Sequence, residues 1–350
     1  MSVAVSFVSC ACLLGLAGGS LAPGDGIPMS WHGQRFTSDA LPEGFPERAR
    51  DAAKLWEPWA AKSGYRLDFD DDARLLLATR RGGSKVEGQL RIALKAEEWF
   101  DALLPPAAGD AAPTAAMLAL KDEKAHAAVL GFVGTVAPEI AAWAEKAAGK
   151  ELGFVLAKPL CGAFVESAAG LKEWNPDHEL LNRTVQVLLL RRYGALPQWL
   201  AQGIAWEAER TLFGSIWCYP HRSGFVAKTE HEAWPKELAA ELENEALTVF
   251  SVESLAAWRT GTYDAEAARH AWGLVHYLAR EKKEALAGAL DDLRALREKS
   301  ERKTHEDGSW EIVPGYEIPA AAQAEIFAKR CGDGWIEEAK AWNLKHAAER

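Results

Sequence analysis

The sequence lacks an excess of basic residues: its 350 residues include 40 Lys and Arg against 50 Asp and Glu, a formal net charge of -10. The sequence also contains no basic stripe and no alternation of basic and aromatic residues that would offset the negative net charge. Because nucleic-acid binding depends on positive charge facing phosphates, the composition argues against a nucleic-acid-binding protein. The hydrophobic fraction of 49% is instead typical of a globular protein, and the length is enough for one or two domains.

Charge is also missing from the start of the chain, since residues 1–24 contain no Asp, Glu, Lys or Arg. An apolar run over residues 3–17 is followed by small residues, a pattern that resembles a secretory signal peptide. The run is too short for a membrane span, and no later segment is long and apolar enough for one. We therefore predict a signal peptide over residues 1–22, with the cleavage position left open. The mature chain would be secreted, periplasmic or part of the cell envelope, without a membrane span.

Cysteine is scarce, and removal of a signal peptide leaves Cys161, Cys218 and Cys331. In an oxidising compartment one pair can form a disulfide, and we favour Cys161 with Cys218 because they flank the central helices. Three buried free thiols fit the sequence equally well.

The rest of the chain is expected to divide at a linker. Residues 23–45 are rich in Gly, Pro and Ser and predict a mobile leader. Residues 46–112 predict an N-terminal α/β region that ends in the linker PPAAGDAAP, and residues 113–350 predict a second domain. The alternative is that this stretch is only a surface loop. The expected strands are 65–69, 75–79, 116–120, 152–157 and 161–165, and the expected early helices are 46–63, 122–133 and 138–148. The later helices are expected at 237–247, 251–258, 264–281 and 286–296, with a solvated loop at 297–309.

The stretch over residues 175–209 is the most informative part of the sequence. Asn175 is a good N-cap for a very apolar helix that Gly194 can end, and a second helix follows from near Pro197 toward Gly214. Helices that are apolar on most faces belong in a core. Packing therefore gives no reason for a histidine and a glutamate side by side in the first turn of the first helix.

That pair is His178 and Glu179, and it is followed by Asn182 and, on the second helix, by the segment Trp-Leu-Ala-Gln202-Gly. The arrangement resembles the gluzincin zinc metallopeptidases, in particular the peptidase-MA-like domains of bacterial proteins. Their pattern is H-E-x-x-H on one helix and W-L-x-E-G on the next. In that family the two histidines and the second glutamate bind zinc, and the first glutamate acts as general base. The resemblance covers roughly residues 115–347.

The resemblance implies an α+β, zincin-like fold: a small mixed sheet with helices, including an edge strand over a cleft, and then a largely helical C-terminal half. His178 and Glu179 stand at the positions of the first ligand and the general base. Asn182 and Gln202 replace the other two ligands, and an amide oxygen is a poor substitute for imidazole or carboxylate. Glu179 is therefore a remnant of a general base, with little hydrolytic power in the absence of a metal.

Three hypotheses for the function follow. The first is a non-catalytic pseudopeptidase without a cofactor. It binds a polypeptide or envelope protein in the cleft that holds the substrate in the peptidase family, or it acts as a scaffold. In it, Asn182 and Gln202 hydrogen-bond each other and His178 is a satisfied buried residue. The second is a zinc metallopeptidase with a rearranged or weakened metal site, to which His221 or His231 could contribute. The third is a structural domain whose cleft is filled.

Two carboxylates near Gln202 are weaker candidates for a metal site. Glu209 lies on a similar face of the helix but about 10 Å further along its axis, and Glu207 lies well around the helix. We expect both to be solvated or capping groups. His270 and His276, six residues apart on a later helix, do not share a face, and we expect core or surface roles for them.

Overall fold

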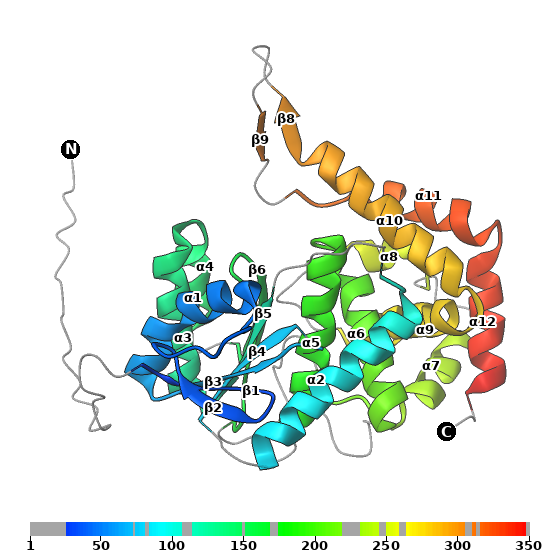
Figure 1. Ribbon diagram of the computed structural model, residues 1–350. Helices are drawn as coiled ribbons and strands as arrows, with labels where there is room; N and C mark the ends of the chain where they lie inside the picture. The colour runs from blue at the N-terminus through cyan, green and yellow to red at the C-terminus, as the bar shows by residue number, and fades with distance from the viewer. Residues whose placement is uncertain are drawn as a thin grey trace, which may run out of the picture.

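The computed structural model describes residues 26–72, 74–80, 84–106, 114–148, 151–168, 174–218, 232–244, 250–258, 264–304, 310–312 and 316–347. Within these ranges the chain forms a sheet-containing N-terminal half beside a helical C-terminal half (Figure 1). The α+β class and this order of the two halves confirm the expectation from the sequence. The predicted signal peptide over residues 1–22 lies outside the described residues, and the zincin-like nature of the fold stays a prediction.

A seven-stranded mixed sheet forms the centre of the N-terminal half. Its strands are β1 (Pro28–Trp31), β2 (Gln34–Thr37), β3 (Arg66–Asp70), β4 (Leu75–Thr79), β5 (Ala115–Leu120), β6 (Gly153–Ala157) and β7 (Leu160–Val165). They are arranged in the order β2-β1-β3-β4-β5-β7-β6. The pairs β1–β3, β4–β5 and β5–β7 are parallel, and the other neighbours are antiparallel. Strand β6 is therefore an edge of the sheet and pairs with β7 by an antiparallel register.

The sheet corrects two expectations about the organisation of the chain. Residues 28–37, expected in a leader, form the hairpin of β1 and β2, whose turn residues His32 and Gly33 have φ of 49° and 74°. Two positive φ angles are what a tight two-residue hairpin turn needs, so composition alone suggested a loop where a hairpin forms. The sheet also extends across the expected domain boundary near residue 113, because β4 before it pairs with β5 after it.

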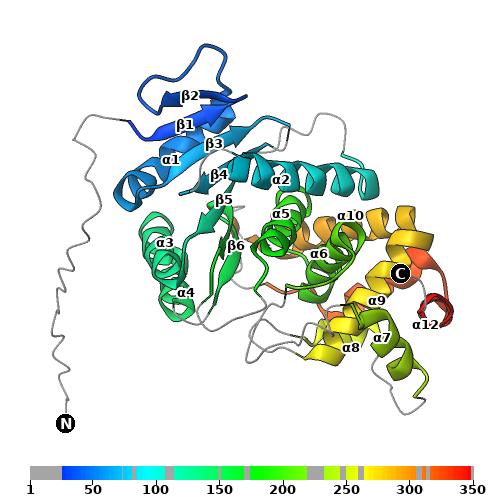
Figure 2. The ribbon, with the colours of Figure 1, turned by 90° about the horizontal axis from the view of Figure 1, so that it is seen from below.

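Helices cover both faces of this sheet. The helices of one face are α1 (Glu47–Ser63), α3 (Glu123–Val136) and α4 (Ala141–Ala147), with the short 3-10 helix η1 (Pro138–Ile140) between the last two. The other face packs against α2 (Ser84–Leu103) and α5 (Pro176–Tyr193) (Figure 2). Alternate residues of β4 enter the two cores, Leu76 on one side and Leu77 on the other. A strand covered on both faces accounts for the uninterrupted apolar run of its sequence.

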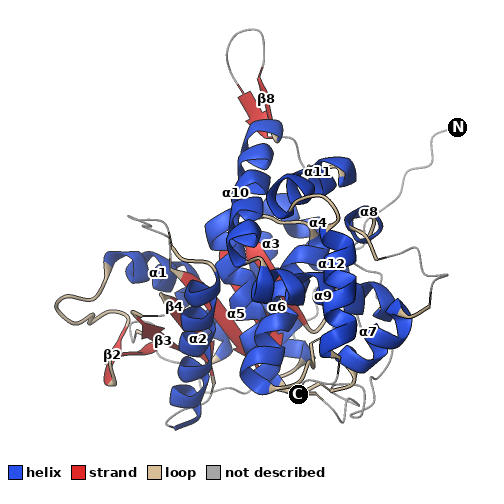
Figure 3. Cartoon of the chain, turned by 90° about the vertical axis from the view of Figure 1, so that its right-hand side faces the viewer, coloured by secondary structure: helices blue, strands red, loops and turns tan. Residues whose placement is uncertain are grey.

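The C-terminal half continues from α5 as a set of packed helices (Figure 3). They are α6 (Gln198–Phe213), α7 (Trp234–Leu242), α8 (Val252–Ala256), α9 (Ala265–Glu281), α10 (Lys283–Ser300), α11 (Ala320–Cys331) and α12 (Trp335–His346). The expected loop 297–309 is partly ordered, since α10 extends into it and β8 (Arg302–Thr304) pairs with β9 (Trp310–Ile312). The helices α11 and α12 are separated at Gly332 and Gly334, whose φ angles are positive. None of the helices described is long and apolar enough to cross a bilayer.

The three cysteines of the described residues are buried free thiols. The pairing of Cys161 with Cys218 is therefore wrong, and the alternative of free thiols is what the structure contains. Cys161 lies at 0% exposure in β7, and burial raises the pKa of its thiol well above the usual range. A protonated thiol in this position behaves as a small apolar core residue.

A glycine brings α6 and α9 unusually close together. A Cβ atom at Gly203 would lie 2.7 Å from Val275 Cγ2 and 2.9 Å from the carbonyl oxygen of Ala271. Because one of these neighbours is backbone, a side chain cannot be accommodated without a shift of one helix. The Gly of the W-L-x-Q-G segment therefore has a packing role that is independent of any metal chemistry.

We predict that Gly203→Ala lowers the free energy of unfolding by about 1–3 kcal/mol, because the added methyl overpacks the contact of α6 with α9. Urea denaturation measures this change. The matched control is Gly131→Ala in α3, where a Cβ meets no atom within 4 Å. That control should raise the stability by about 0.5–1 kcal/mol through helix propensity. Equal effects of the two changes would contradict the close-packing argument.

His126 in α3 is buried at 1% exposure, and its ring packs against Phe154 of β6 at 5.5 Å between centroids. Burial lowers the pKa of His126 to about 4, and the positive charge of Arg183 contributes in the same direction. Between about pH 6.5 and this value, the unfolded chain binds a proton that the folded chain does not. The free energy of unfolding therefore falls as the pH decreases through this window.

We predict that His126→Leu removes a slope of up to about 1.4 kcal/mol per pH unit from the stability profile between pH 6.5 and pH 4. Urea denaturation at a series of pH values, compared with the parent chain, measures the difference in slope. A parent chain and variant with parallel profiles would show that His126 titrates normally in the folded state.

Candidate functional site: a buried polar cluster between α5 and α6

The N-terminus of α5 places His178 toward α6. Asn175 caps the helix, since its side-chain Oδ1 accepts hydrogen bonds from the backbone N–H groups of Asp177 and His178 at 3.2 Å and 3.4 Å. The His178 side chain is 6% exposed, and its Nδ1 lies 2.8 Å from Oε2 of Glu209 on α6. A carboxylate at this distance accepts the hydrogen bond, so Nδ1 carries the proton. Capping thus positions the imidazole and Glu209 orients it.

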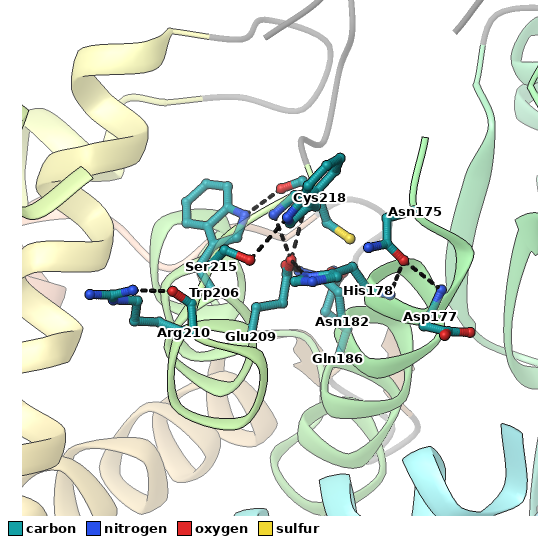
Figure 4. Close-up of polar contacts among 12 residues, drawn as sticks. Asn175, Asp177, His178, Asn182, Gln186, Trp206, Glu209, Arg210, Ser215 and Cys218 are labelled. Carbon is teal, nitrogen blue, oxygen red and sulfur yellow. Dashed lines mark hydrogen bonds and ion pairs between the residues drawn. The ribbon is translucent and has the colours of Figure 1, made fainter. Parts of the chain in front are cut away.

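Glu209 is the centre of the cluster and is fully buried. Its carboxylate accepts hydrogen bonds from His178 Nδ1, from Asn182 Nδ2 at 2.7 Å, and from the backbone N–H groups of Trp217 and Cys218 at 2.8 Å and 3.2 Å. Figure 4 shows these donors converging on one carboxylate. A buried carboxylate needs this number of partners to replace its lost hydration. The expectation that Glu209 is solvated or a capping group is wrong.

The amides of Asn182 and Gln202, at the positions that the resemblance aligns with zinc ligands, are connected through a third amide. Gln186 Nε2 donates to Asn182 Oδ1 at 2.5 Å, and the side chains of Gln186 and Gln202 lie 3.4–3.5 Å from each other. The expected direct hydrogen bond between Asn182 and Gln202 is therefore replaced by a bridge through Gln186. His178, Glu209, Asn182, Gln186 and Gln202 form one continuous chain of polar contacts along the interface of α5 with α6.

Glu179 faces a different part of the structure. It is 1% exposed, and its Oε2 lies 3.3 Å from Arg183 one turn further along α5. Arg183 in turn packs against β6, since a Cβ at Gly153 would lie 3.2 Å from its Nε. Glu179, at the position that the resemblance aligns with the general base, therefore pairs with a buried guanidinium beside the edge strand.

The residues at the three ligand positions do not fit a zinc site of the family type. They supply one imidazole and two amides. The Asn182 amide contacts Glu209 and Gln186, and the Gln202 amide contacts Gln186 at 3.4–3.5 Å. Zinc sites in proteins are built from imidazole, thiolate and carboxylate groups. Among the residues that the structure describes, no group of three or more His, Cys, Asp and Glu side chains is placed to hold a metal ion. His221 and His231, the candidate replacement ligands, lie outside the described residues.

Glu207 is also buried, contrary to the expectation from the sequence, and it faces α9 on the other side of α6. Its Oε2 accepts a hydrogen bond from Trp272 Nε1 at 3.1 Å and lies 2.8 Å from His276 Nδ1. His270 is at 0% exposure and lies against Phe250. The core roles expected of these histidines therefore include a direct pairing of His276 with a carboxylate.

A cavity of about 420 Å³ lies beside the cluster, between the edge strand β6 and the helices α5 and α6. Gly153, Phe154, Val155 and Leu156 of β6 form one wall of this edge-strand cleft. Gln186 and Gln202 reach its opposite wall, together with Arg183 and Ala201. The polar chain of contacts is thus open to the cleft at its Gln186–Gln202 end.

Of the residues in this cluster, Gln186 was missed from the sequence, and Glu209 was considered but expected to be solvated or a capping group. A signal for each existed in the spacing. Glu209 follows Gln202 by seven residues and Gln186 follows Asn182 by four, so each pair shares one helix face. The spacing gave no information on how α5 and α6 pack against each other. They are antiparallel, so the end of one helix lies against the start of the other.

The fold and site define a mixed α+β protein with a buried histidine–carboxylate–amide cluster beside an edge-strand cleft. A family model described as "Protein of unknown function (DUF1570)" matches residues 178–303. The matched segment begins at His178 and ends in β8, so it contains both helices of the cluster but not the seven-stranded sheet. No curated protein matches the chain.

We predict that Glu209→Gln lowers the free energy of unfolding by about 2–4 kcal/mol, because an amide N–H₂ then faces buried donors in place of an acceptor oxygen. Urea denaturation measures the loss. The matched control is Glu298→Gln, which removes the charge of a half-exposed carboxylate paired with Arg294 on α10. The control should change the stability by less than about 0.5 kcal/mol. If both changes are equally mild, Glu209 is not the centre of the cluster.

Proposed function

We propose that this protein is a non-catalytic pseudopeptidase, related to the peptidase-MA-like gluzincins, that binds a polypeptide in the edge-strand cleft. The observation that carries the proposal is the polar cluster itself. The groups at two of the three former ligand positions are amides, and they are engaged with Glu209 and Gln186. The chemistry of this donor set favours a hydrogen-bonding role over metal binding.

The cleft has the features of a site for an extended peptide. One wall is a sheet edge, where the backbone groups on the outer side of β6 are suited to pairing with an added strand. The other wall carries Gln186 and Gln202, which offer side-chain donors and acceptors to a peptide backbone. The apolar side chains of Trp143 and Leu156 add surface for the side chains of the ligand. The signal-peptide-like N-terminus places this activity outside the cytoplasm in the proposal.

A second candidate function is a zinc metallopeptidase with a rearranged or weakened metal site. One observation favours it. His178 has its Nδ1 held by a buried carboxylate, an arrangement that in metal sites orients the opposite nitrogen, Nε2, toward the ion. A complete site would need further ligands, and His221 and His231 are the candidates.

Peptide binding tests the first candidate. We predict that an array of random decapeptides contains binders of the natural chain, and that Ala201→Trp weakens them at least about tenfold because the indole fills the cleft. The matched control is Ala321→Trp, at an exposed position of α11. Thermal unfolding of both variants shows that each is folded. Binding that survives Ala201→Trp unchanged would place the peptide elsewhere, and an array without binders would contradict the proposal.

Metal content separates the two candidates. We predict that the chain from residue 23, equilibrated with zinc and freed of excess, retains no zinc by mass spectrometry. The double variant Asn182→His with Gln202→Glu, which restores the ligand set of the family, should retain about one zinc per chain. The double variant Asn182→Ala with Gln202→Ala is the control and should retain none. Near-stoichiometric zinc in the natural chain would overturn the pseudopeptidase proposal in favour of the metallopeptidase.

A further inference from the structure

A second cavity, of about 550 Å³, lies in the helical half and shares no lining residue with the edge-strand cleft. It is bounded by α6, α7, α9 and α12, of which α7, α9 and α12 lie together at one end of the molecule (Figure 1). Its volume is within the range of small-molecule sites in proteins. We refer to it as the α9–α12 cavity.

A fixed imidazole forms part of its wall. His276 Nδ1 lies 2.8 Å from Oε2 of Glu207, and the His276 ring is stacked on Trp272 at 4.8 Å between centroids. Because the carboxylate accepts, the neutral ring has its proton on Nδ1, and its Nε2 is left as a hydrogen-bond acceptor. The His276 side chain is 19% exposed, so the ring is held in place but accessible from the cavity.

Of the two carboxylates near the cavity, Glu207 is buried, whereas Glu281 is exposed and lines the cavity. Glu207 is 2% exposed at its side chain, and besides His276 it accepts hydrogen bonds from Trp272 Nε1 and from Thr211 Oγ1 at 3.2 Å. Glu281 accepts a hydrogen bond from Trp342 Nε1 at 3.0 Å. The negative charge of Glu207 is therefore satisfied by donors of the protein, whereas the charge of Glu281 is exposed and faces the two guanidinium groups of the same lining.

Two guanidinium groups line the same cavity. Arg210 donates to the carbonyl oxygen of Gly214, and Arg280 lies 3.6 Å from Oε1 of Glu207 with a side chain that is 51% exposed. Each guanidinium has five N–H donors, so these contacts leave donors for a ligand. Guanidinium groups bind carboxylate and phosphate oxygens with charge-assisted hydrogen bonds.

Aromatic rings supply the remaining surface. Trp342 lines the cavity and lies edge-on to His276 at 4.9 Å between ring centroids, and the His346 ring lies 4.3 Å from it by the same measure. His346 is held by its Nδ1, which donates to the carbonyl oxygen of Trp342 at 2.7 Å. A wall of indole and imidazole rings favours a flat ligand.

We propose that the α9–α12 cavity binds a small organic anion with a planar aromatic ring. Arg280 and Arg210 bind the anionic group, Trp342 contacts the ring, and Nε2 of His276 accepts a hydrogen bond from a donor on the ligand. This site is separate from the edge-strand cleft and does not depend on the function proposed for it.

Ligand-observed NMR and calorimetry with defined probes test this inference on the full chain. The probes are benzoate, 4-hydroxybenzoate and indole-3-acetate, and the comparison compounds are 4-hydroxybenzamide, which is uncharged, and cyclohexanecarboxylate, which is not planar. We expect the planar anions to bind and each comparison compound to bind at least about tenfold more weakly. The absence of binding by every planar anion at concentrations up to about 10 mM would overturn the proposal. Equal binding of the uncharged amide would do the same.

Two variants locate the binding. Arg280→Gln removes a half-exposed guanidinium and should weaken 4-hydroxybenzoate about tenfold. Arg294→Gln on α10 is the matched control, since its side chain is 50% exposed and also paired with a carboxylate, and it should leave the affinity unchanged. Thermal unfolding confirms that both variants are folded. In ¹⁵N-histidine spectra, 4-hydroxybenzoate should shift the Nε2 resonance of His276, and an unchanged resonance or unchanged affinity in Arg280→Gln would refute the assignment.

Discussion

The buried carboxylate of Glu209 is the constraint on which the arrangement of the central helices depends. A charge at 0% exposure is stable only when donors replace its water, and the four donors come from two segments of the chain other than α6. Asn182 and His178 come from α5, the backbone N–H groups of Trp217 and Cys218 from the segment after α6, and Glu209 itself from α6. Any displacement of these segments would leave buried polar groups unpaired, so the cluster specifies their mutual position.

The same helix α6 carries a second buried carboxylate, Glu207, two residues earlier and on another face. Glu209 pairs with a histidine of α5 and Glu207 with a histidine of α9, so α6 lies between two histidine–carboxylate pairs. The two pairs lie in different surroundings. One is enclosed beside the edge-strand cleft, and the other is accessible from the α9–α12 cavity. A single helix with two buried acids thus organises both polar regions of the molecule.

Much of the fold could be predicted from the sequence, because helix caps and apolar runs depend on residues that are neighbours in the chain. Asn175 and Gly194 mark the ends of α5, and the apolar run LLLAT marks a strand buried on both faces. The hairpin at residues 28–37 could not be recognised, because its composition is that of a loop and its stability comes from pairing with β3. The site was half predictable in the same way: motif positions identified His178 and Asn182, whereas their partner Glu209 is defined by the packing of two helices.

The glycine contact between α6 and α9 has a consequence for recognition. Because Gly203 has no side chain, α6 packs directly against the backbone of α9. The helix therefore cannot tilt or slide toward α9 without a steric clash. The wall of the edge-strand cleft formed by α6 is therefore preorganised before any ligand arrives. In the proposed binding of a polypeptide, the entropic cost would then fall mainly on the ligand, which would favour chains that are already extended over those that must be straightened.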